Sequence, residues 1–545
     1  MNYRDEDVTP LTHVISGIVR YFNKWRLILF VFLLVYAVLL SLDLEYAALH
    51  WDEMPHLNGG LLLVRGQIQE YVRNGSYYPP IFDVVIAFFF RILGASVFSG
   101  RIVSVTFGVL SIWCVFEFAY RFYGPRNALL SSILLASMPG FIWLCRVALI
   151  ETALLFFFSL LLLLFFSWIH TDNIKILFLC GVSLGLSFLV KYNALVGALI
   201  MLASTFLLWR ERILTKLSRF SLIIITAMMT ILPWVFSKYE LYLSGMFERW
   251  LYSVQVGSTA ALAYSTRYPT PIFYLVEMTY SYSNIHPILL PISVLAFAGL
   301  GCWFWRRKHA DKFCLIWFLV VYAVFTLVPD RSWRYVTLAF PVLAVSASDV
   351  VLRVWDKTRH GLGARKASLH KININKIFGF AFIFLVTASV FYSSWDAYLW
   401  NQREYANVPI REASQYVAKH SASNEALIVL CSSDLFNLDM VKFYLQTYDR
   451  NQMTIWQYPE MAIDAYTPAF NVTELINRVE ALHVKYLLLY EYSDLQYFKS
   501  DLWYHEVLAM LYDTGRFVVE TMFGDRPNQI YLISFLSNFT ATYHP

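Results

Sequence analysis

Residues 27–42 read LILFVFLLVYAVLLSL, an apolar run without a charged side chain. Two further runs, Leu154–Trp168 and Ile377–Ser394, have the same character. Each approaches the roughly 20 residues that a helix needs to cross the hydrocarbon core of a bilayer. Of the 545 residues, 58% are hydrophobic and 15% are charged, and the mean hydropathy is +0.52. Because a soluble domain carries about 25% charged residues, the sequence predicts a polytopic α-helical membrane protein.

Apolar segments along the chain predict about eleven transmembrane helices. They cover residues 26–43, 99–121, 127–145, 151–169, 174–190, 194–209, 220–237, 287–305, 313–328, 334–352 and 377–395. The net charge of +5 comes from short basic clusters between these runs, which does not indicate nucleic-acid binding. If the spans alternate strictly, every basic cluster falls on one side, and the positive-inside rule makes that side the cytoplasm. We therefore expect a cytoplasmic N-terminus that is not a cleaved signal peptide.

The apolar segment 80–97 does not fit this alternation, because counting it as a span would put every later basic cluster outside. Asp83 and Arg91 also suit the membrane surface better than the bilayer centre. The Pro79-Pro80 pair is typical of a helix start. We therefore predict a helix that lies in the outer membrane interface.

The last part of the chain changes in composition, which divides it into a membrane domain, 1–395, and an extracytoplasmic domain, 396–545. In the second domain, strand-like runs alternate with helical ones, which predicts a small α/β fold. The expected strands are Ala426–Cys431, Tyr486–Tyr490, Phe517–Thr521 and Ile530–Phe535, and the expected helices are Arg411–Lys419, Met440–Tyr448 and Thr473–Leu482. The six cysteines show no metal-ligand spacing, so we expect neither a zinc site nor structural disulfides.

Two acidic positions follow the ends of predicted spans on the same, outer side. Asp52 and Glu53 come shortly after the first span, with His56 about one helical turn later. Glu151 opens the fourth span, and Arg146 precedes it. An adjacent acidic pair is more often solvated charge, and a carboxylate at a helix N-terminus is often there for the helix dipole. Their shared side of the membrane favours a functional site instead.

Cations collect on this outer side as well, at the ends of separate helices. Lys191 ends the fifth span, and Arg331 and Arg334 precede the tenth. Each side chain could merely extend to the interface, which is the commoner role of such residues. With Arg146 before the fourth span, cations at three separate helix ends point rather to a phosphate or pyrophosphate ligand.

Short motifs follow one another in a recognisable order. They are Trp51-Asp52-Glu53, Tyr78-Pro79-Pro80, Phe98-Ser-Gly-Arg101, Phe122-Tyr-Gly-Pro-Arg126, Ser137-Met-Pro-Gly140, Arg146 to Glu151, Leu189-Val-Lys191-Tyr192, Leu232-Pro-Trp234 and Arg334-Tyr335 with Pro341. This order resembles the GT-C glycosyltransferases of the protein O-mannosyltransferase and aminoarabinose-transferase type (glycosyltransferase family 39 and its relatives). The resemblance covers roughly residues 26–345.

The resemblance implies a polyprenyl-phosphate sugar donor, an extracytoplasmic active site and an inverting single displacement. It also implies that Asp52 is the catalytic base, that Glu53 is its partner and that Glu151 is the second acidic residue of the site. The residues expected to bind substrate are His56, Tyr78, Arg146, Lys191, Arg331, Arg334 and Tyr335. Some relatives carry Lys or His at the place of Tyr78, so the group that contacts the donor phosphate stays open.

The residue chemistry agrees with a glycosyltransferase that needs no cofactor. A carboxylate can take the proton of an attacking hydroxyl, and cations can meet the departing lipid phosphate. A divalent metal shared by Asp52 and Glu151, as in the oligosaccharyltransferase relatives, is the less favoured alternative. A transporter or flippase for lipid-linked sugars would show internal repeats and polar residues near mid-membrane, and neither is evident. A receptor with an inert membrane anchor would not need so many spans. The sugar and the acceptor stay open.

Overall fold

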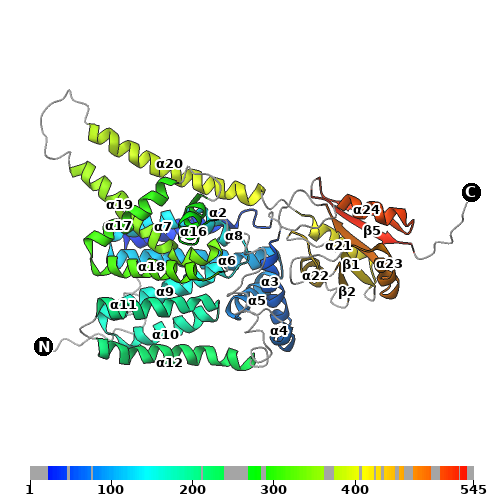
Figure 1. Cartoon of the computed structure of the whole chain (residues 1–545), viewed down its shortest axis with the longest axis horizontal. Helices are drawn as coiled ribbons and strands as arrows, with labels where there is room; N and C mark the ends of the chain where they lie inside the picture. The colour runs from blue at the N-terminus through cyan, green and yellow to red at the C-terminus, as the bar shows by residue number, and fades with distance from the viewer. Residues whose placement is uncertain are drawn as a thin grey trace, which may run out of the picture.

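The computed structural model describes residues 23–45, 49–74, 78–209, 213–238, 268–283, 290–329, 331–360, 374–403, 408–422, 425–430, 435–448, 453–459, 470–491, 504–526 and 528–536. Figure 1 shows a bundle of long helices and, beyond one end of it, a small domain built on a sheet. Three shorter helices, α3 (Met54–Val64), α4 (Ile68–Asn74) and α5 (Ile81–Leu93), lie at this end of the bundle. We call it the domain-proximal end.

Within the described residues, seven helical segments are long and apolar enough to cross a bilayer. They are α2 (Lys24–Ser41), α6 (Val97–Phe122), α9 (Glu151–Thr171), α12 (Ile213–Ser237), α18 (His309–Leu327), α19 (Phe340–His360) with the preceding 3-10 helix η5 (Trp333–Ala339), and α20 (Ile374–Arg403). Shorter apolar helices lie among them, namely α10 (Ile174–Phe188), α11 (Leu195–Leu208) with η2 (Tyr192–Ala194), and α17 (Leu290–Arg306). Together with one bent pair, these helices account for the eleven predicted spans.

The third predicted span, 127–145, is wrong as a single straight helix. The chain there forms α7 (Pro125–Ala136) and α8 (Pro139–Arg146), which are bent by 66° relative to each other. Pro139 has no backbone N–H and disfavours helical geometry in the residue before it, and Met138 is extended, with ψ 123°. As a result, α8 leaves the direction of α7 and carries Arg146 away from a regular span end.

The predicted interfacial helix corresponds to α5, which at 13 residues is not among the candidate spans. One face of α5 carries Phe82, Asp83 and Phe90 and is buried, mainly against α3 and α6. The opposite face exposes apolar side chains such as Phe88 and Ile92. Such a two-faced apolar helix suits a position along the membrane surface, as the sequence predicts.

Small residues let the helices of the bundle approach closely. Helices α10 and α12 share an extensive contact at which Gly181 faces Thr226. A Cβ atom added at Gly181 would lie 1.6 Å from Thr226 Oγ1 and 2.7 Å from the carbonyl oxygen of Ile223. Close backbone approach of this kind drives helix association in lipid, where the hydrophobic effect does not.

The C-terminal domain contains a five-stranded sheet with the strand order β2-β1-β3-β5-β4. Strands β1 (Ala426–Leu430), β2 (Thr454–Tyr458) and β3 (Val484–Tyr490) run parallel, whereas β5 (Ile530–Phe535) pairs antiparallel with β3 and with β4 (Phe517–Phe523). Alternating side chains of β1 and β3 pack on opposite faces: one with α21 (Ile410–His420) and α22 (Leu438–Thr447), the other with α23 (Val472–Ala481) and α24 (Tyr504–Asp513). The predicted α/β domain is therefore present, although β2 and α24 were not predicted.

The two parts of the chain pack through α22, which lies against α3. The rings of Phe90 and Phe443 are 6.3 Å apart, and Arg65 donates a hydrogen bond of 2.5 Å to the carbonyl oxygen of Gln446. An ion pair of 3.3 Å joins Arg411 to Glu45. These contacts place the sheet domain directly against the helices that follow the first span.

Candidate active site

Four charged side chains meet at the domain-proximal end of the bundle. Arg334 Nη1 lies 2.8 Å from Asp52 Oδ2 and 3.8 Å from Glu151 Oε1. Lys191 Nζ lies 3.0 Å from the same Glu151 oxygen. The sequence placed these residues on one side of the membrane, and the fold brings them into one cluster of two carboxylates and two cations. We call Asp52, Glu151, Lys191 and Arg334 the charged cluster.

Each member of the charged cluster stands at the end of a helical element. Asp52 lies in the 3-10 helix η1 (Trp51–Glu53), which follows α2, and Glu151 is the first residue of α9. Lys191 follows α10, and Arg334 lies in η5, where the Ser332 side chain caps the first turn. Helices α9 and α10 are consecutive neighbours, so the start of one meets the end of the other. Glu151 is additionally favoured by the positive end of the α9 dipole.

The members of the charged cluster differ in exposure. The side chains of Asp52 and Arg334 are 24% and 27% exposed, whereas those of Lys191 and Glu151 are 13% and 3% exposed. Glu151 Oε2 is buried and has no hydrogen-bond partner among the described residues. A ligand would therefore meet Asp52 and Arg334 first, with Glu151 and Lys191 beneath them.

The environment of Asp52 favours its ionised form. Burial alone would raise the pKa of Asp52, but the Arg334 guanidinium, with its charge and its hydrogen bond, holds this pKa below the ordinary value. His50, which the sequence reasoning did not consider, lies 3.8 Å from Asp52 and accepts a hydrogen bond of 3.1 Å from its backbone N–H. Burial lowers the pKa of His50, so its imidazole is neutral near pH 7.

Glu53 does not join the charged cluster. Its carboxylate is fully buried, pairs with Arg101 at 2.7 Å and 2.8 Å, and accepts backbone N–H groups of Ala148 and His50. Burial would raise the pKa of Glu53, but Arg101 and these hydrogen bonds outweigh it and hold the pKa low. With both oxygens engaged, the carboxylate connects η1 to α6 and to the segment between α8 and α9. We therefore assign Glu53 a structural role rather than the predicted place in the catalytic pair.

The predicted substrate ligand His56 is buried behind the charged cluster. His56 Nδ1 lies 2.7 Å from Asp83 Oδ1, and the Tyr71 hydroxyl donates a hydrogen bond of 2.9 Å to Asp83 Oδ2. The His56 ring also lies 5.1 Å from that of Tyr78. Nothing in the local sequence indicated that Asp83, on α5, is its partner.

Tyr335 reaches the charged cluster, whereas two predicted cations do not. The Tyr335 ring lies 5.6 Å from Lys191 Nζ, a distance at which a cation–π contact holds the ammonium in place. Arg146 instead donates hydrogen bonds to the carbonyl oxygens of Leu40 and Asp43 at the end of α2, a position that follows from the bend before α8. Arg331 donates a hydrogen bond of 3.0 Å to Thr270.

The charged cluster combines two carboxylates with two cations. Among the described residues, no group of three or more His, Cys, Asp and Glu side chains could hold a metal ion. The Arg334 guanidinium also lies between Asp52 and Glu151, where a bridging metal ion would bind.

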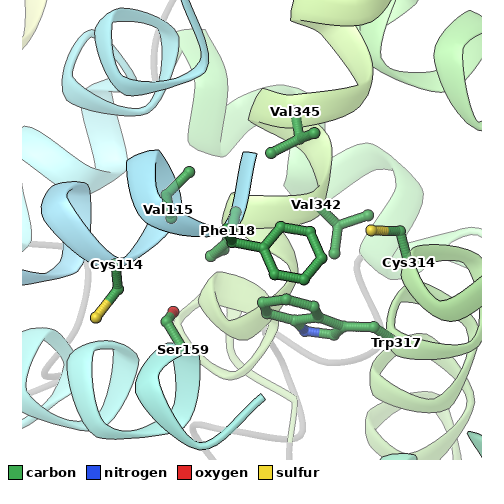
Figure 2. Close-up of a pocket in the computed structure, with 9 residues that line it drawn as sticks. Cys114, Val115, Phe118, Ser159, Cys314, Trp317, Val342 and Val345 are labelled. Carbon is green, nitrogen blue, oxygen red and sulfur yellow. The ribbon is translucent and has the colours of Figure 1, made fainter. Parts of the chain in front are cut away.

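A separate cavity of about 10 Å³, lined by Cys114, Ser159, Trp317 and other side chains of the bundle core, is shown in Figure 2. Its size suits one water molecule and not a substrate.

Parts of the chain are similar in sequence to known proteins. Residues 78–236 match the family model of dolichyl-phosphate-mannose-protein mannosyltransferases, a range that includes Glu151 and Lys191. An uncharacterised protein of Aquifex aeolicus (strain VF5) is 24% identical over 297 residues, which are 53% of this chain and 56% of that protein, so the match spans about half of each.

Two solved structures share the fold across most of the chain. ArnT from Cupriavidus metallidurans bound to undecaprenyl phosphate has a TM-score of 0.63 and 14% identity, and the alignment covers 94% of this chain and 98% of ArnT. The archaeal oligosaccharyltransferase AglB from Archaeoglobus fulgidus, in complex with an inhibitory peptide and a dolichol-phosphate, has a TM-score of 0.56 and 14% identity over 86% of this chain and 69% of AglB. At these identities the likeness establishes the arrangement of helices and not the substrate.

Proposed function

We propose that the chain is a GT-C membrane glycosyltransferase that transfers a sugar from a polyprenyl-phosphate carrier to an acceptor hydroxyl. The match of residues 78–236 to the mannosyltransferase family model and the fold shared with ArnT and AglB support this. ArnT and AglB have been solved with undecaprenyl phosphate and dolichol-phosphate, which supports a carrier of this class. The family match supports a mannose-like hexose or a related sugar.

The observation that carries this proposal is the charged cluster itself. A transfer from a lipid phosphate needs a base for the acceptor hydroxyl and a cationic partner for the departing phosphate. Asp52 supplies the first, and Arg334 and Lys191 supply the second, at helix ends where a lipid head group and an acceptor can meet.

The reaction is an inverting single displacement. The acceptor oxygen attacks the anomeric carbon on the face opposite the phosphate, and its proton passes to the Asp52 carboxylate. The bond between the anomeric carbon and the phosphate oxygen breaks, and its electron pair leaves with the phosphate. Because Arg334 and Lys191 stabilise that anion, the leaving group needs no proton and the reaction needs no divalent metal.

The membrane orientation follows from the basic clusters between the spans. We place the N-terminus in the cytoplasm, with the charged cluster, α5 and the sheet domain on the extracytoplasmic side. The sheet domain packs against α3, which continues directly from η1, and so it stands beside the route that an acceptor takes to Asp52.

Transfer from a panel of radiolabelled polyprenyl-phosphate sugars to membrane extracts tests this function directly. The purified protein should release polyprenyl phosphate and label an acceptor with at least one donor, and the activity should persist in EDTA. A protein that moves the lipid-linked sugar across a vesicle membrane without cleaving it would be a flippase instead, and the proposal would be abandoned.

A further inference from the structure

We propose that Arg334 is a lock on the catalytic base: its guanidinium pairs with Asp52 until a donor phosphate arrives and then transfers to the phosphate, which frees the carboxylate to accept a proton. The inference rests on the proposed function, because it assumes a phosphate donor at this site. Arg334 is in this respect a positioning residue that makes the readiness of the base depend on the donor.

The two cations of the charged cluster are not equally available to an anion. Lys191 is committed to Glu151 at 3.0 Å, is largely buried and is covered by the Tyr335 ring. Arg334 is more exposed, and the partner it holds at 2.8 Å, Asp52, is the other exposed member of the cluster. An incoming phosphate therefore competes first with Asp52 for the guanidinium.

The position of Glu151 means that the Arg334 guanidinium has to move only a short distance when it leaves Asp52. Arg334 Nη1 is already 3.8 Å from Glu151 Oε1, so the guanidinium keeps a nearby counter-charge when it leaves Asp52. Glu151 in turn keeps Lys191, and its second oxygen, Oε2, is buried without a hydrogen-bond partner among the described residues. Arginine suits this role because its planar fork binds carboxylate and phosphate with the same geometry.

A carboxylate that is held by a guanidinium is a poor base. The charged groups that face Asp52 are Arg334 from η5, Lys191 from the end of α10 and Glu151 from the start of α9. The imidazole of His50, two residues before Asp52, is neutral. Arg334 is the cation that lowers the pKa of Asp52 most. When Arg334 moves to the phosphate, the pKa of Asp52 therefore rises and the carboxylate becomes a better base. The donor must then bind before the acceptor can be deprotonated.

The methyl phosphodiester of a polyprenol is a suitable probe, because it has one permanent charge and no sugar to transfer. Calorimetry of its binding to the full-length protein in detergent should give a counterintuitive result: Asp52→Asn binds the probe about three- to tenfold more tightly than wild type, because the competing carboxylate is gone. Arg334→Ala should weaken binding at least tenfold, and adding Asp52→Asn to it should change nothing further, as a double-mutant cycle requires for a direct competition. Arg91→Ala, an exposed arginine on α5, is the matched control and should leave the affinity unchanged.

Proton uptake provides a second measurement that does not depend on Arg334→Ala folding. Near pH 5, probe binding to wild type should take up protons, since the freed Asp52 gains affinity for them, and Asp52→Asn should show no uptake. If Asp52→Asn binds the probe no more tightly than wild type, the lock is overturned and the donor assignment stands. If wild type does not bind the probe at all, the proposed donor fails and the lock fails with it.

Discussion

The adjacent carboxylates Asp52 and Glu53 have opposite surroundings. Asp52 is partly open to solvent and pairs with one cation that is itself partly exposed. Glu53 is sealed between Arg101 and two backbone N–H groups. Of these two consecutive residues of η1, the first is therefore accessible to a substrate, whereas the second is held by buried hydrogen bonds within the fold.

Substitution of Asp52 should slow transfer strongly without unfolding the protein. Asp52→Asn keeps the side-chain shape and removes the base, so turnover should fall by about 10²–10⁴. The sign of the pH dependence follows from the depressed pKa of Asp52: the base is ionised at neutral pH, and kcat/KM for the donor should fall only when the pH drops below the ordinary aspartate value of about 3.9. Thermal melting should show an unchanged fold, and near-full transfer activity in this variant would refute the assignment.

Substitution of Glu53 should instead act on stability. Glu53→Gln breaks a buried ion pair and leaves Arg101 uncompensated, a change that typically costs about 3–5 kcal/mol. Because the pKa of Glu53 is lowered in the fold, its stabilisation is present above the pKa of the unfolded state and is lost as the pH falls through the folded-state value. A melting temperature well below that of Asp52→Asn would agree with this. Unchanged stability with lost turnover would restore Glu53 to the catalytic pair.

The charged cluster could be partly predicted from the sequence, because its members follow span ends on one side of the membrane. The partners of the neighbouring residues Glu53 and His56 could not be predicted. Arg101 and Asp83 lie within apolar helical segments, and nothing in their local sequence indicates that they face Glu53 and His56. The sequence also did not indicate that the third predicted span, 127–145, is bent before Pro139, or that Arg146 hydrogen-bonds to the end of α2.

Helix packing in the bundle depends on where glycines let backbones meet. The apolar runs predicted the helices well, since length and hydropathy are local properties. They did not predict the contacts between helices, because in lipid any apolar face is compatible with solvent and only close packing selects a neighbour. Gly181 illustrates this, since its contact with Thr226 joins two helices that are not consecutive in the sequence.

A matched pair of glycine substitutions tests this view. Gly181→Ala should destabilise the protein by about 1–3 kcal/mol, because the new Cβ overlaps Thr226 and the backbone of Ile223. Gly301→Ala, on α17, meets no atom within 4 Å and should be neutral or stabilise by about 0.5–1 kcal/mol through helix propensity. Melting curves of both variants in the same detergent provide the comparison. Equal melting temperatures would show that the contact between α10 and α12 does not limit stability.

At the scale of the whole molecule, one end of the bundle carries nearly everything that the proposed reaction needs. Helices α3 to α5 and the sheet domain lie at the domain-proximal end (Figure 1). Asp52 of the charged cluster lies in η1, which leads directly into α3. The opposite end carries ion pairs such as Arg26 with Glu117 at 2.7 Å, and Arg306 with Asp311 and Asp349, which connect helix ends to one another. This asymmetry agrees with a donor that is presented on one face of the membrane only.

Labelling of engineered cysteines determines which face that is. With Cys302 and Cys431 replaced by alanine, a cysteine at Arg126, at the end of the bundle far from the sheet domain, should react with a membrane-impermeant maleimide only after the cell membrane is opened. A cysteine at Asp525, on the surface of the sheet domain, should react in intact cells. The reason is that the basic residues cluster between spans at the Arg126 end, and positive loops are retained in the cytoplasm. If both positions label from the same side, the number of spans between them is not what the alternation requires. The extracytoplasmic placement of Asp52 and its charged cluster would then have to be withdrawn.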